Sequence, residues 1–328
     1  MIYLDNAATT KADQDVIDSF VKVNQSLYFN PNSPHQAGLQ AEQVLKQAKE
    51  EIDIALNLNH LYHIVFTSGA TESNNMALKG IAYRKRETAN EIITSVLEHP
   101  SVLEVMRYLE EKQGFKLKYV DVKSDGKIDT EHLKSLMSDK VGLVTCMYVN
   151  NIMGQIQPIQ DIVNILKDYP RAHLHVDAVQ ALGKVSMDLN GVDSLSLSGH
   201  KFNGLKGQGL LIIKNIQNIE PVVHGGGQEY GLRSGTVNLP MAVSMVKSIK
   251  LTMGRLDEAR RKLNKMNQSV RTFLEEFRGV YINSPKDSAP QIINVSFPGV
   301  KGEVLVNAFS KHGVMISTTS ADRKSTRL

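Results

Sequence analysis

Apolar and polar residues follow two periods that alternate repeatedly between residues 35 and 215. From Ala37 to Ala55 the apolar residues recur about every 3.6 positions, with Gln, Lys and Glu between them, which predicts an amphipathic helix. Similar helical patterns cover Glu72–Arg86, Ser101–Gln113 and Ile159–Asp168. Short apolar runs bounded by polar or turn residues predict strands at Ile64–Thr67, Ile92–Ser95, Leu117–Val122, Gly142–Val149, Leu174–Val176, Leu195–Leu197 and Leu210–Ile213.

Strands that alternate with helices predict an α/β fold, in which a largely parallel sheet is covered by helices on both faces. The pattern changes near residue 240, where Leu239–Phe277 predicts one long helix that contains a single glycine, Gly254. After this helix, Ile292–Phe297 and Val314–Thr318 predict strands of a second, smaller sheet. We therefore expect a large domain and a smaller one, with the boundary near residue 250.

Composition, cysteine content and charge narrow the class of protein. The 328 residues are 41% hydrophobic and 22% charged, which excludes a collagenous, mucin-like or wholly disordered chain. The one cysteine, Cys146, allows no disulfide within the chain, and we find no signal peptide or membrane-spanning run, so we expect a cytoplasmic protein. Residues 322–328 supply +2 of the net charge of +4, and the remainder gives no reason to expect nucleic acid or a membrane as a partner.

Candidate chemistry lies at the carboxyl ends of the predicted strands, where open α/β sheets bind ligands. The small-residue turn 68–71 leads into a helix, and the free N–H groups at a helix N-terminus suit a phosphate. Asp177 directly follows an apolar run and there needs a cationic partner, although Asp is also a common helix N-cap. Lys201 follows another apolar run beside Ser198 and His200. A lysine in such a pocket can form a Schiff base, whereas an isolated lysine is more often an ordinary surface residue.

Together these features match one cofactor. A phosphate site, a strand-end carboxylate and a strand-end lysine are what pyridoxal phosphate (PLP) requires of a protein. Asp177 would keep the pyridine nitrogen protonated, so that the ring withdraws electrons from the substrate carbon. Lys201 would carry the cofactor as an imine and later move protons, and His99 would lie over the face of the ring.

Eight segments of the chain occur in the order and spacing of a known enzyme family. They are YLDNAATT, TSGATESNN, EHPSVL, VNNIMG, HVDAVQALGK, SLSGHKFNGLKGQG, HGGGQEYGLRSGT and PQIINVSF. From residue 2 to about 321 the chain resembles the NifS/IscS-like cysteine desulfurases, which are class V aminotransferases with the type I fold of PLP-dependent transferases. This resemblance implies a large domain with a mainly parallel, seven-stranded sheet covered by helices, and a smaller α+β domain that is incomplete here.

The resemblance also implies a role for each matching residue. Lys201 would be the Schiff-base lysine and Asp177 the partner of the pyridine nitrogen. Gln180 would bond the ring hydroxyl, His99 would stack on the ring and move protons, and Asn151 would lie near the ring hydroxyl and the substrate carboxylate. The phosphate would be held by residues from both subunits of a homodimer: Ala70, Thr71, Ser198 and His200 from one, and Thr236 from the other.

The family's reaction converts L-cysteine to L-alanine and passes the sulfur, as a persulfide on a mobile-loop cysteine, to an acceptor protein. The acceptor would be an iron–sulfur scaffold or an enzyme of tRNA or cofactor thiolation. In the family this cysteine follows a Ser-Gly-Ser-Ala-like run, but here the matching run Ser317–Ala321 is followed by Asp322, which cannot carry sulfane sulfur. Cys146 lies in an apolar strand pattern and is predicted to be a core residue. We therefore expect this chain to be catalytically incomplete.

The implied domain division places a large PLP-binding domain at 16–250 and a small domain at 1–15 and 251–321. We interpret residues 322–328 as a non-native tail; the alternative is a natural short paralogue with a basic tail.

Two other functions stay open. One is a different class V reaction, such as that of a selenocysteine lyase or an aminotransferase, and the other is a truncated chain that binds PLP without turnover.

Two pairs of histidines are weaker candidates, in this case for a metal site. His60 with His63, and His173 with His175, have spacings that metal ligands also use. No acidic or cysteine ligand accompanies them at a matching spacing, so we expect no metal site.

Overall fold

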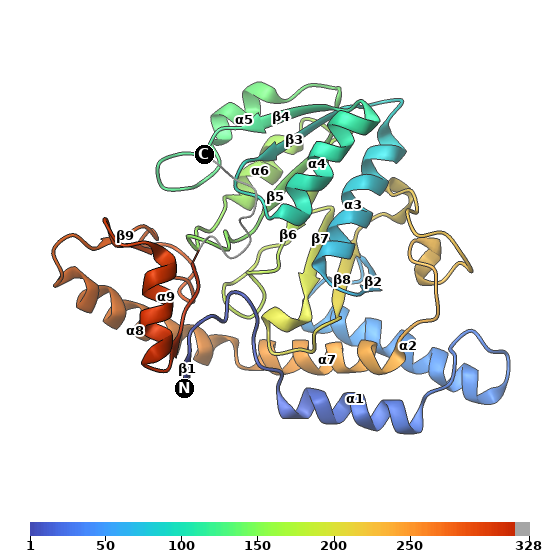
Figure 1. Cartoon of the computed structure of the whole chain (residues 1–328). Helices are drawn as coiled ribbons and strands as arrows, with labels where there is room; N and C mark the ends of the chain where they lie inside the picture. Colours follow the sequence, from blue (N-terminus) through green and yellow to red (C-terminus); the bar gives the residue numbers. More distant parts are fainter. Residues whose placement is uncertain (319–328) are drawn as a thin grey trace.

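A seven-stranded sheet forms the centre of the computed structural model, which describes residues 1–318 (Figure 1). Its strands, in the spatial order of the sheet, are β2 (His63–Thr67), β8 (Gly209–Ile213), β7 (Ser194–Ser198), β6 (His173–Asp177), β5 (Val141–Met147), β3 (Glu91–Ser95) and β4 (Lys116–Val120). All neighbouring strands run parallel except β8, which is antiparallel to both β2 and β7. The predicted α/β class with a mainly parallel seven-stranded sheet is confirmed.

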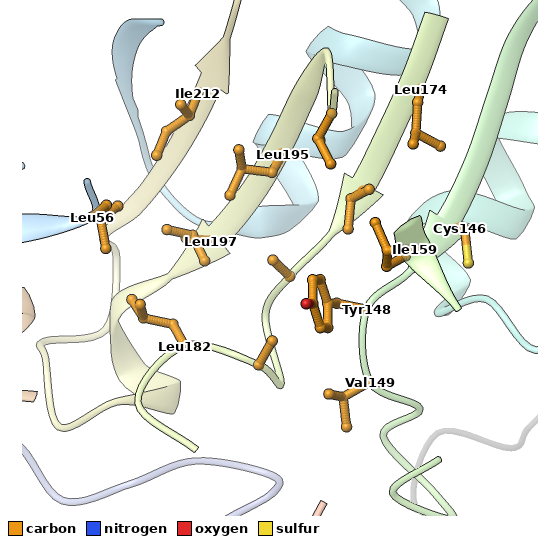
Figure 2. Close-up of a cluster of buried hydrophobic side chains, with 14 of the residues drawn as sticks. Leu56, Cys146, Tyr148, Val149, Ile159, Leu174, Leu182, Leu195, Leu197 and Ile212 are labelled. Carbon is orange, nitrogen blue, oxygen red and sulfur yellow. The ribbon is translucent and has the colours of Figure 1, made fainter. Parts of the chain in front are cut away.

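The strands are apolar on both faces because helices cover both sides of the sheet. In β8, Leu210 and Ile212 belong to one buried cluster, while Leu211 and Ile213 belong to the other. The first cluster includes residues of α2 (Gln36–Ala55), α6 (Ile159–Leu166) and α7 (Leu239–Gly254), and the second includes residues of α3 (Ala70–Lys85) and α4 (Pro100–Gln113). Figure 2 shows the first cluster, in which Leu195 and Leu197 of β7 lie between Ile212 and Tyr148. This double burial explains the continuous apolar runs of the sequence.

Helix α4 illustrates how local sequence fixes an element that carries a site residue. Its N-cap is His99, whose Nδ1 accepts a hydrogen bond from the Ser101 backbone N–H at 3.1 Å. Pro100 occupies the first turn, where its missing N–H would have had no helical partner. The helix ends at Gly114, which takes the left-handed conformation with φ of +73°. His99 is thereby held just beyond the carboxyl end of β3.

The remaining elements lie around this sheet or beyond α7 (Figure 1). Helix α1 (Gln14–Ser26) packs against α7, and α5 (Thr130–Leu136) lies beside β4 and α6. Beyond α7 the chain forms α8 (Leu256–Glu275), β9 (Tyr281–Ile282), β10 (Val295–Ser296), α9 (Gly302–Lys311) and β11 (Val314–Met315), and β11 pairs with β1 (Ile2–Tyr3). Within the described residues, no helix has the length and apolar character needed to cross a membrane.

The region after residue 239 differs from the sequence prediction in two ways. The expected single helix over 239–277 is two helices, because Arg255 leaves the helical conformation, with φ of −104° and ψ of 0°. Gly254 precedes this break and weakens the helix locally, since glycine is a poor helix former. The expected second sheet is two separate two-stranded pairs, β1 with β11 and β9 with β10. Strands of two residues are too short to show the alternation of apolar and polar residues from which a strand is predicted.

The break at Arg255 separates two kinds of environment. Helix α7 packs against α1 and α2 and contributes to the core, whereas α8 has no buried residue and exposes Met266 and Phe273. We propose on this basis that the large domain covers 16–250 and the small domain 1–15 and 251–321, of which residues 319–321 lie outside the described residues.

Candidate active site

The candidate site lies where several parallel strands end at the same edge of the sheet. Asp177 is the last residue of β6, and Ser198 is the last residue of β7. Lys201 ends the short 3-10 helix that follows β7 directly, and Ala70 opens α3 after β2. The fold therefore brings together the residues that the sequence analysis selected from separate motifs.

The Lys201 amine is held by the N-terminal segment of the chain. Its Nζ donates to the carbonyl oxygens of Ala7 and Ala8 at 2.7 and 2.8 Å. Gln180 Nε2 donates to the same Ala7 carbonyl at 2.9 Å. Lys184 Nζ donates to the Lys201 backbone carbonyl at 2.6 Å. Residues distant in the sequence thus fix both the backbone and the amine of Lys201.

Small residues keep space open where α3 begins. Gly69 is the N-cap of α3 and offers no side chain, so the first-turn N–H groups are not capped by it. A Cβ on Gly209, the first residue of β8, would lie 2.5 Å from the backbone of Gly69, so only glycine permits this approach. A Cβ on Gly69 would itself point toward Ser198 Oγ, 4.0 Å away. The N–H groups of α3 and the Ser198 hydroxyl can therefore act on one anion.

Positive charge is concentrated beside this space. Burial, followed by the neighbouring charges of Lys201, Lys206 and Lys184, lowers the pKa of His200 to about 4, so the ring is neutral at pH 7. Burial, followed by the charge of Lys201, lowers the pKa of Lys184 to about 8. His200 Nδ1 lies 3.1 Å from Thr9 Oγ1, which fixes the ring. Like charges held this closely favour a bound anion.

Asp177 is buried, and both of its carboxylate oxygens accept a hydrogen bond. Oδ1 accepts from the Val179 N–H at 3.1 Å, and Oδ2 accepts from Asn74 Nδ2 at 2.9 Å. The residues after Asp177 form turns rather than a helix, so the alternative interpretation of Asp177 as a helix N-cap is wrong. Each oxygen keeps a second lone pair for a further donor.

His99 and Asn151 lie on two loops that contact each other at this edge. His99 is half-buried, and its Nδ1 lies 2.9 Å from Ser101 Oγ. Asn151 lies in the turn after β5, next to the buried Asn150. Asn150 Nδ2 donates to the carbonyl of Leu97 at 3.3 Å, which ties this turn to the loop that carries His99.

Thr236 lies on an exposed stretch of the segment that precedes α7. Arg233 of the same segment forms an ion pair with Glu72 in the first turn of α3, with 2.9 Å between Nε and Oε1. The single chain thus places the segment near the start of α3, while the contact of Thr236 with a partner's phosphate stays a prediction.

Glu98 is a buried acid that the sequence analysis missed. Its Oε1 accepts from the Met147 N–H at 2.8 Å, while Oε2 has no hydrogen-bond partner among the described residues. Burial, followed by the negative charge of Asp177, raises the pKa of Glu98 to about 8, so the carboxyl is largely protonated at pH 7. A glutamate after a strand usually faces solvent, so nothing in the residue type itself indicates burial.

Replacing Glu98 with Gln should make the free energy of unfolding less dependent on pH. In the native protein the pKa of Glu98 is raised from 4.5 to about 8. The contribution of this carboxyl to the free energy of unfolding is therefore fully present below pH 4.5 and is lost as pH rises through about 8. The full loss is roughly 5 kcal/mol, of which about 3.5 kcal/mol falls between pH 5 and pH 8. Gln carries no charge and keeps an oxygen for the Met147 N–H. Urea unfolding at pH 5 and pH 8 measures the effect.

The matched control for this variant is Glu111→Gln, which removes an exposed carboxylate. It should keep the pH dependence of the native protein. If Glu98→Gln has the same pH dependence as this control, the carboxyl of Glu98 is not protonated in the folded protein.

The histidines that were considered as metal ligands take part in other contacts. His173 Nε2 and His175 Nδ1 both lie 2.8 Å from Ser194 Oγ. Within residues 1–318, no group of three or more His, Cys, Asp or Glu side chains is arranged to hold a metal ion.

The chain is similar to known proteins over nearly its whole length. The family model described as Aminotransferase class-V matches residues 2–321. A NifS/IcsS protein homolog of Lactobacillus delbrueckii subsp. bulgaricus is 40% identical over 326 residues, which cover 98% of this chain and 84% of the relative. Cysteine desulfurase IscS of Dictyoglomus turgidum is 37% identical over 324 residues, or 98% and 82% of the two chains. A solved structure of a NifS-like protein matches with a TM-score of 0.92 at 39% identity, covering 97% of this chain and 87% of that one.

Proposed function

The chain belongs to the class V aminotransferases and, within them, to the NifS/IscS cysteine desulfurases, and from this premise we propose that it uses PLP, bound through Lys201, to act on L-cysteine. The observation that carries the proposal is the convergence at one sheet edge of an amine, a buried carboxylate and an uncapped helix N-terminus. Those are the three groups that PLP requires of a protein.

The polar groups of the site fit the cofactor. Gln180 Oε1 is buried and has no hydrogen-bond partner among the described residues, so it is available to the ring hydroxyl. Asp177 offers a carboxylate to the ring nitrogen. The phosphate would be held by the first turn of α3 with Ala70 and Thr71, by Ser198 and by His200. When bound, PLP supplies a ring that withdraws electrons from the substrate carbon.

The protein's own groups then orient the reactants and move protons. Asp177 would stabilise a proton on the ring nitrogen, because a buried carboxylate favours a cation beside it. The Nδ1 atom of His99 accepts from the Ser101 N–H, so the proton of the neutral ring is on Nε2, the atom from which His99 would move protons. The Lys201 amine would bind the cofactor and take up or release the proton of the substrate carbon.

Sulfur transfer requires an accessible thiol. Cys146 is fully buried in β5, and burial, followed by the charge of Glu98, raises the pKa of its thiol well above the usual value. A thiol that is neither accessible nor ionised is a poor nucleophile, so Cys146 does not fit the role of sulfur carrier. Asp322, which follows the matching run, lies outside the described residues.

Substrate trials separate this proposal from the two alternatives. The protein loaded with PLP would be mixed separately with L-cysteine, L-selenocysteine and pairs of amino and keto acids. The proposal predicts that L-cysteine changes the visible spectrum and that amino groups are not exchanged between the acid pairs. Exchange without a response to L-cysteine would indicate an aminotransferase, and no response to any substrate would indicate a chain that only binds PLP.

We also propose a homodimer in which Thr236 reaches the partner's phosphate. Thr236→Ala should then weaken PLP retention about tenfold, because a hydrogen bond to a charged group contributes about 1.5 kcal/mol. Equilibrium dialysis measures retention, and sedimentation measures the dimer. Thr88→Ala, which removes another exposed threonine hydroxyl, is the control and should retain PLP like the native protein. A monomer that holds PLP fully would contradict the proposal.

The acceptor of the sulfur and the cytoplasmic location stay predictions. The relative of Dictyoglomus turgidum is named a cysteine desulfurase IscS, which supports an acceptor of the iron–sulfur or thiolation class. A pull-down with candidate scaffold and tRNA-thiolation proteins would distinguish between the two.

A further inference from the structure

Asn74 is a buried amide that lies directly behind the candidate site. It lies on α3 and is fully buried, with 0% of its surface exposed. Its Nδ2 donates to Asp177 Oδ2 and to Ser101 Oγ, both at 2.9 Å. Its Oδ1 lies 3.1 Å from His175 Nε2. One amide therefore contacts the chain segments that carry the ring-nitrogen partner and the stacking histidine.

The orientation of this amide follows from the chemistry of its neighbours. An ionised carboxylate only accepts hydrogen bonds, so the Asn74 atom that faces Asp177 is the NH2 group. Oδ1 then faces His175, whose Nε2 must carry the proton. Burial lowers the pKa of His175 to about 3, so its Nδ1 is unprotonated and accepts from the Ser194 hydroxyl at 2.8 Å. The contacts with Asp177, His175 and Ser194 are therefore all consistent with the same orientation of the Asn74 amide.

The second branch runs from Asn74 to His99. Ser101 Oγ accepts from Asn74 Nδ2, which leaves its own proton for His99 Nδ1 at 2.9 Å. The backbone N–H of Ser101 donates to the same nitrogen at 3.1 Å. Asn74 thereby orients the hydroxyl that, together with the backbone, fixes the ring of His99.

We propose that Asn74 is a positioning residue that holds Asp177 and His99 in one hydrogen-bond array and thereby sets the proton balance at the ring nitrogen. This inference rests on the proposed function, since both residues act on PLP. The side-chain amide is suited to this place because it donates twice and accepts once. Leucine would leave Asp177 Oδ2 without this donor, and a carboxylate would repel it.

The test compares Asn74→Leu, Ser101→Ala and a control variant. The control is Gln157→Leu, because Gln157 is also a buried amide, with 4% exposed, and bonds Ile128 and Gly126 rather than the site. The first measurement is the 15N spectrum of labelled histidines in the protein without PLP. In the native protein His175 should be protonated on Nε2 and His99 unprotonated on Nδ1. Protonation of His175 on Nδ1 would overturn the array.

The second measurement is the 15N signal of PLP labelled at its ring nitrogen. Asn74→Leu should shift the proton from the ring nitrogen toward Asp177 by about tenfold, because the carboxylate loses a charge-assisted donor. Ser101→Ala should alter the His99 signal and leave the ring nitrogen as in the native protein, which separates the two branches even where Asn74→Leu folds poorly. The control should leave both signals unchanged.

A ring-nitrogen signal that is the same in Asn74→Leu and Gln157→Leu would show that Asn74 has only a structural role and would overturn the inference. The histidine spectra require no cofactor. Failure of the native protein to bind PLP would therefore contradict the proposed function, and it would be distinguishable from failure of the array.

Discussion

Lys201→Ala should lose all covalent attachment of PLP, while the native protein should form a visible band that borohydride reduces onto Lys201. The expected effect is complete because no other residue type at this position can form the imine. In the fold, the Lys201 amine lies at the end of β7, next to the strand end that carries Asp177. Absorbance after reconstitution, followed by reduction and mass spectrometry, measures the attachment.

Two comparisons make this prediction specific. Lys214→Ala removes an exposed lysine just after β8 and should keep the full covalent label. Lys184 is the second amine near the site, but it is buried and bonds the carbonyl of Lys201. A covalent label on Lys184 in the native protein would show that the assignment of the cofactor to Lys201 is wrong.

The chain with this sequence should form no persulfide and release no sulfide from L-cysteine above the rate without enzyme. The step needs a thiolate that can reach the substrate sulfur. The one cysteine, Cys146, has 0% of its surface exposed, and burial, together with the charge of Glu98, raises the pKa of its thiol. Sulfide assays and mass spectrometry of the protein after exposure to L-cysteine measure the two products.

A gain-of-function variant is the counterpart of this experiment. Asp322→Cys places a thiol directly after the run Ser317–Ala321, where the family carries its persulfide cysteine, and should produce a detectable persulfide. If the unmodified chain instead releases sulfide at a rate comparable to its relatives, the conclusion that it lacks the sulfur-accepting thiol is wrong. Cys146→Ser would then show whether Cys146 carries the sulfur.

Most of the seven-stranded sheet and of the helices that cover it could be predicted from the sequence, because burial leaves a clear pattern there. The run Leu210–Ile213 is apolar at every position, since β8 has a buried cluster on each face. The break at Arg255 could not be predicted, because the apolar and polar residues on both sides keep a helical pattern. Strand β1 pairs with β11 from the other end of the chain, and two residues carry no local signal of that pairing.

The candidate site was predictable where a polar residue directly follows an apolar run. Asp177 and Lys201 are such residues, and the family motifs reinforce them. Glu98 and Asn74 were missed because their burial depends on tertiary packing. Asn74 lies within a helix whose polar residues look exposed in the sequence, and it becomes buried only because α3 packs onto the sheet beside Asp177. The functional roles of all these residues stay predictions.

The most direct test of the account is to locate the cofactor on the native chain. The protein would be reconstituted with PLP, reduced with borohydride, digested and analysed by mass spectrometry. We predict one phosphopyridoxyl group per chain, on the peptide that contains Lys201 in the segment Ser198–Lys201 after β7. A protein that stays colourless, or that carries the group on a different lysine, would contradict the account.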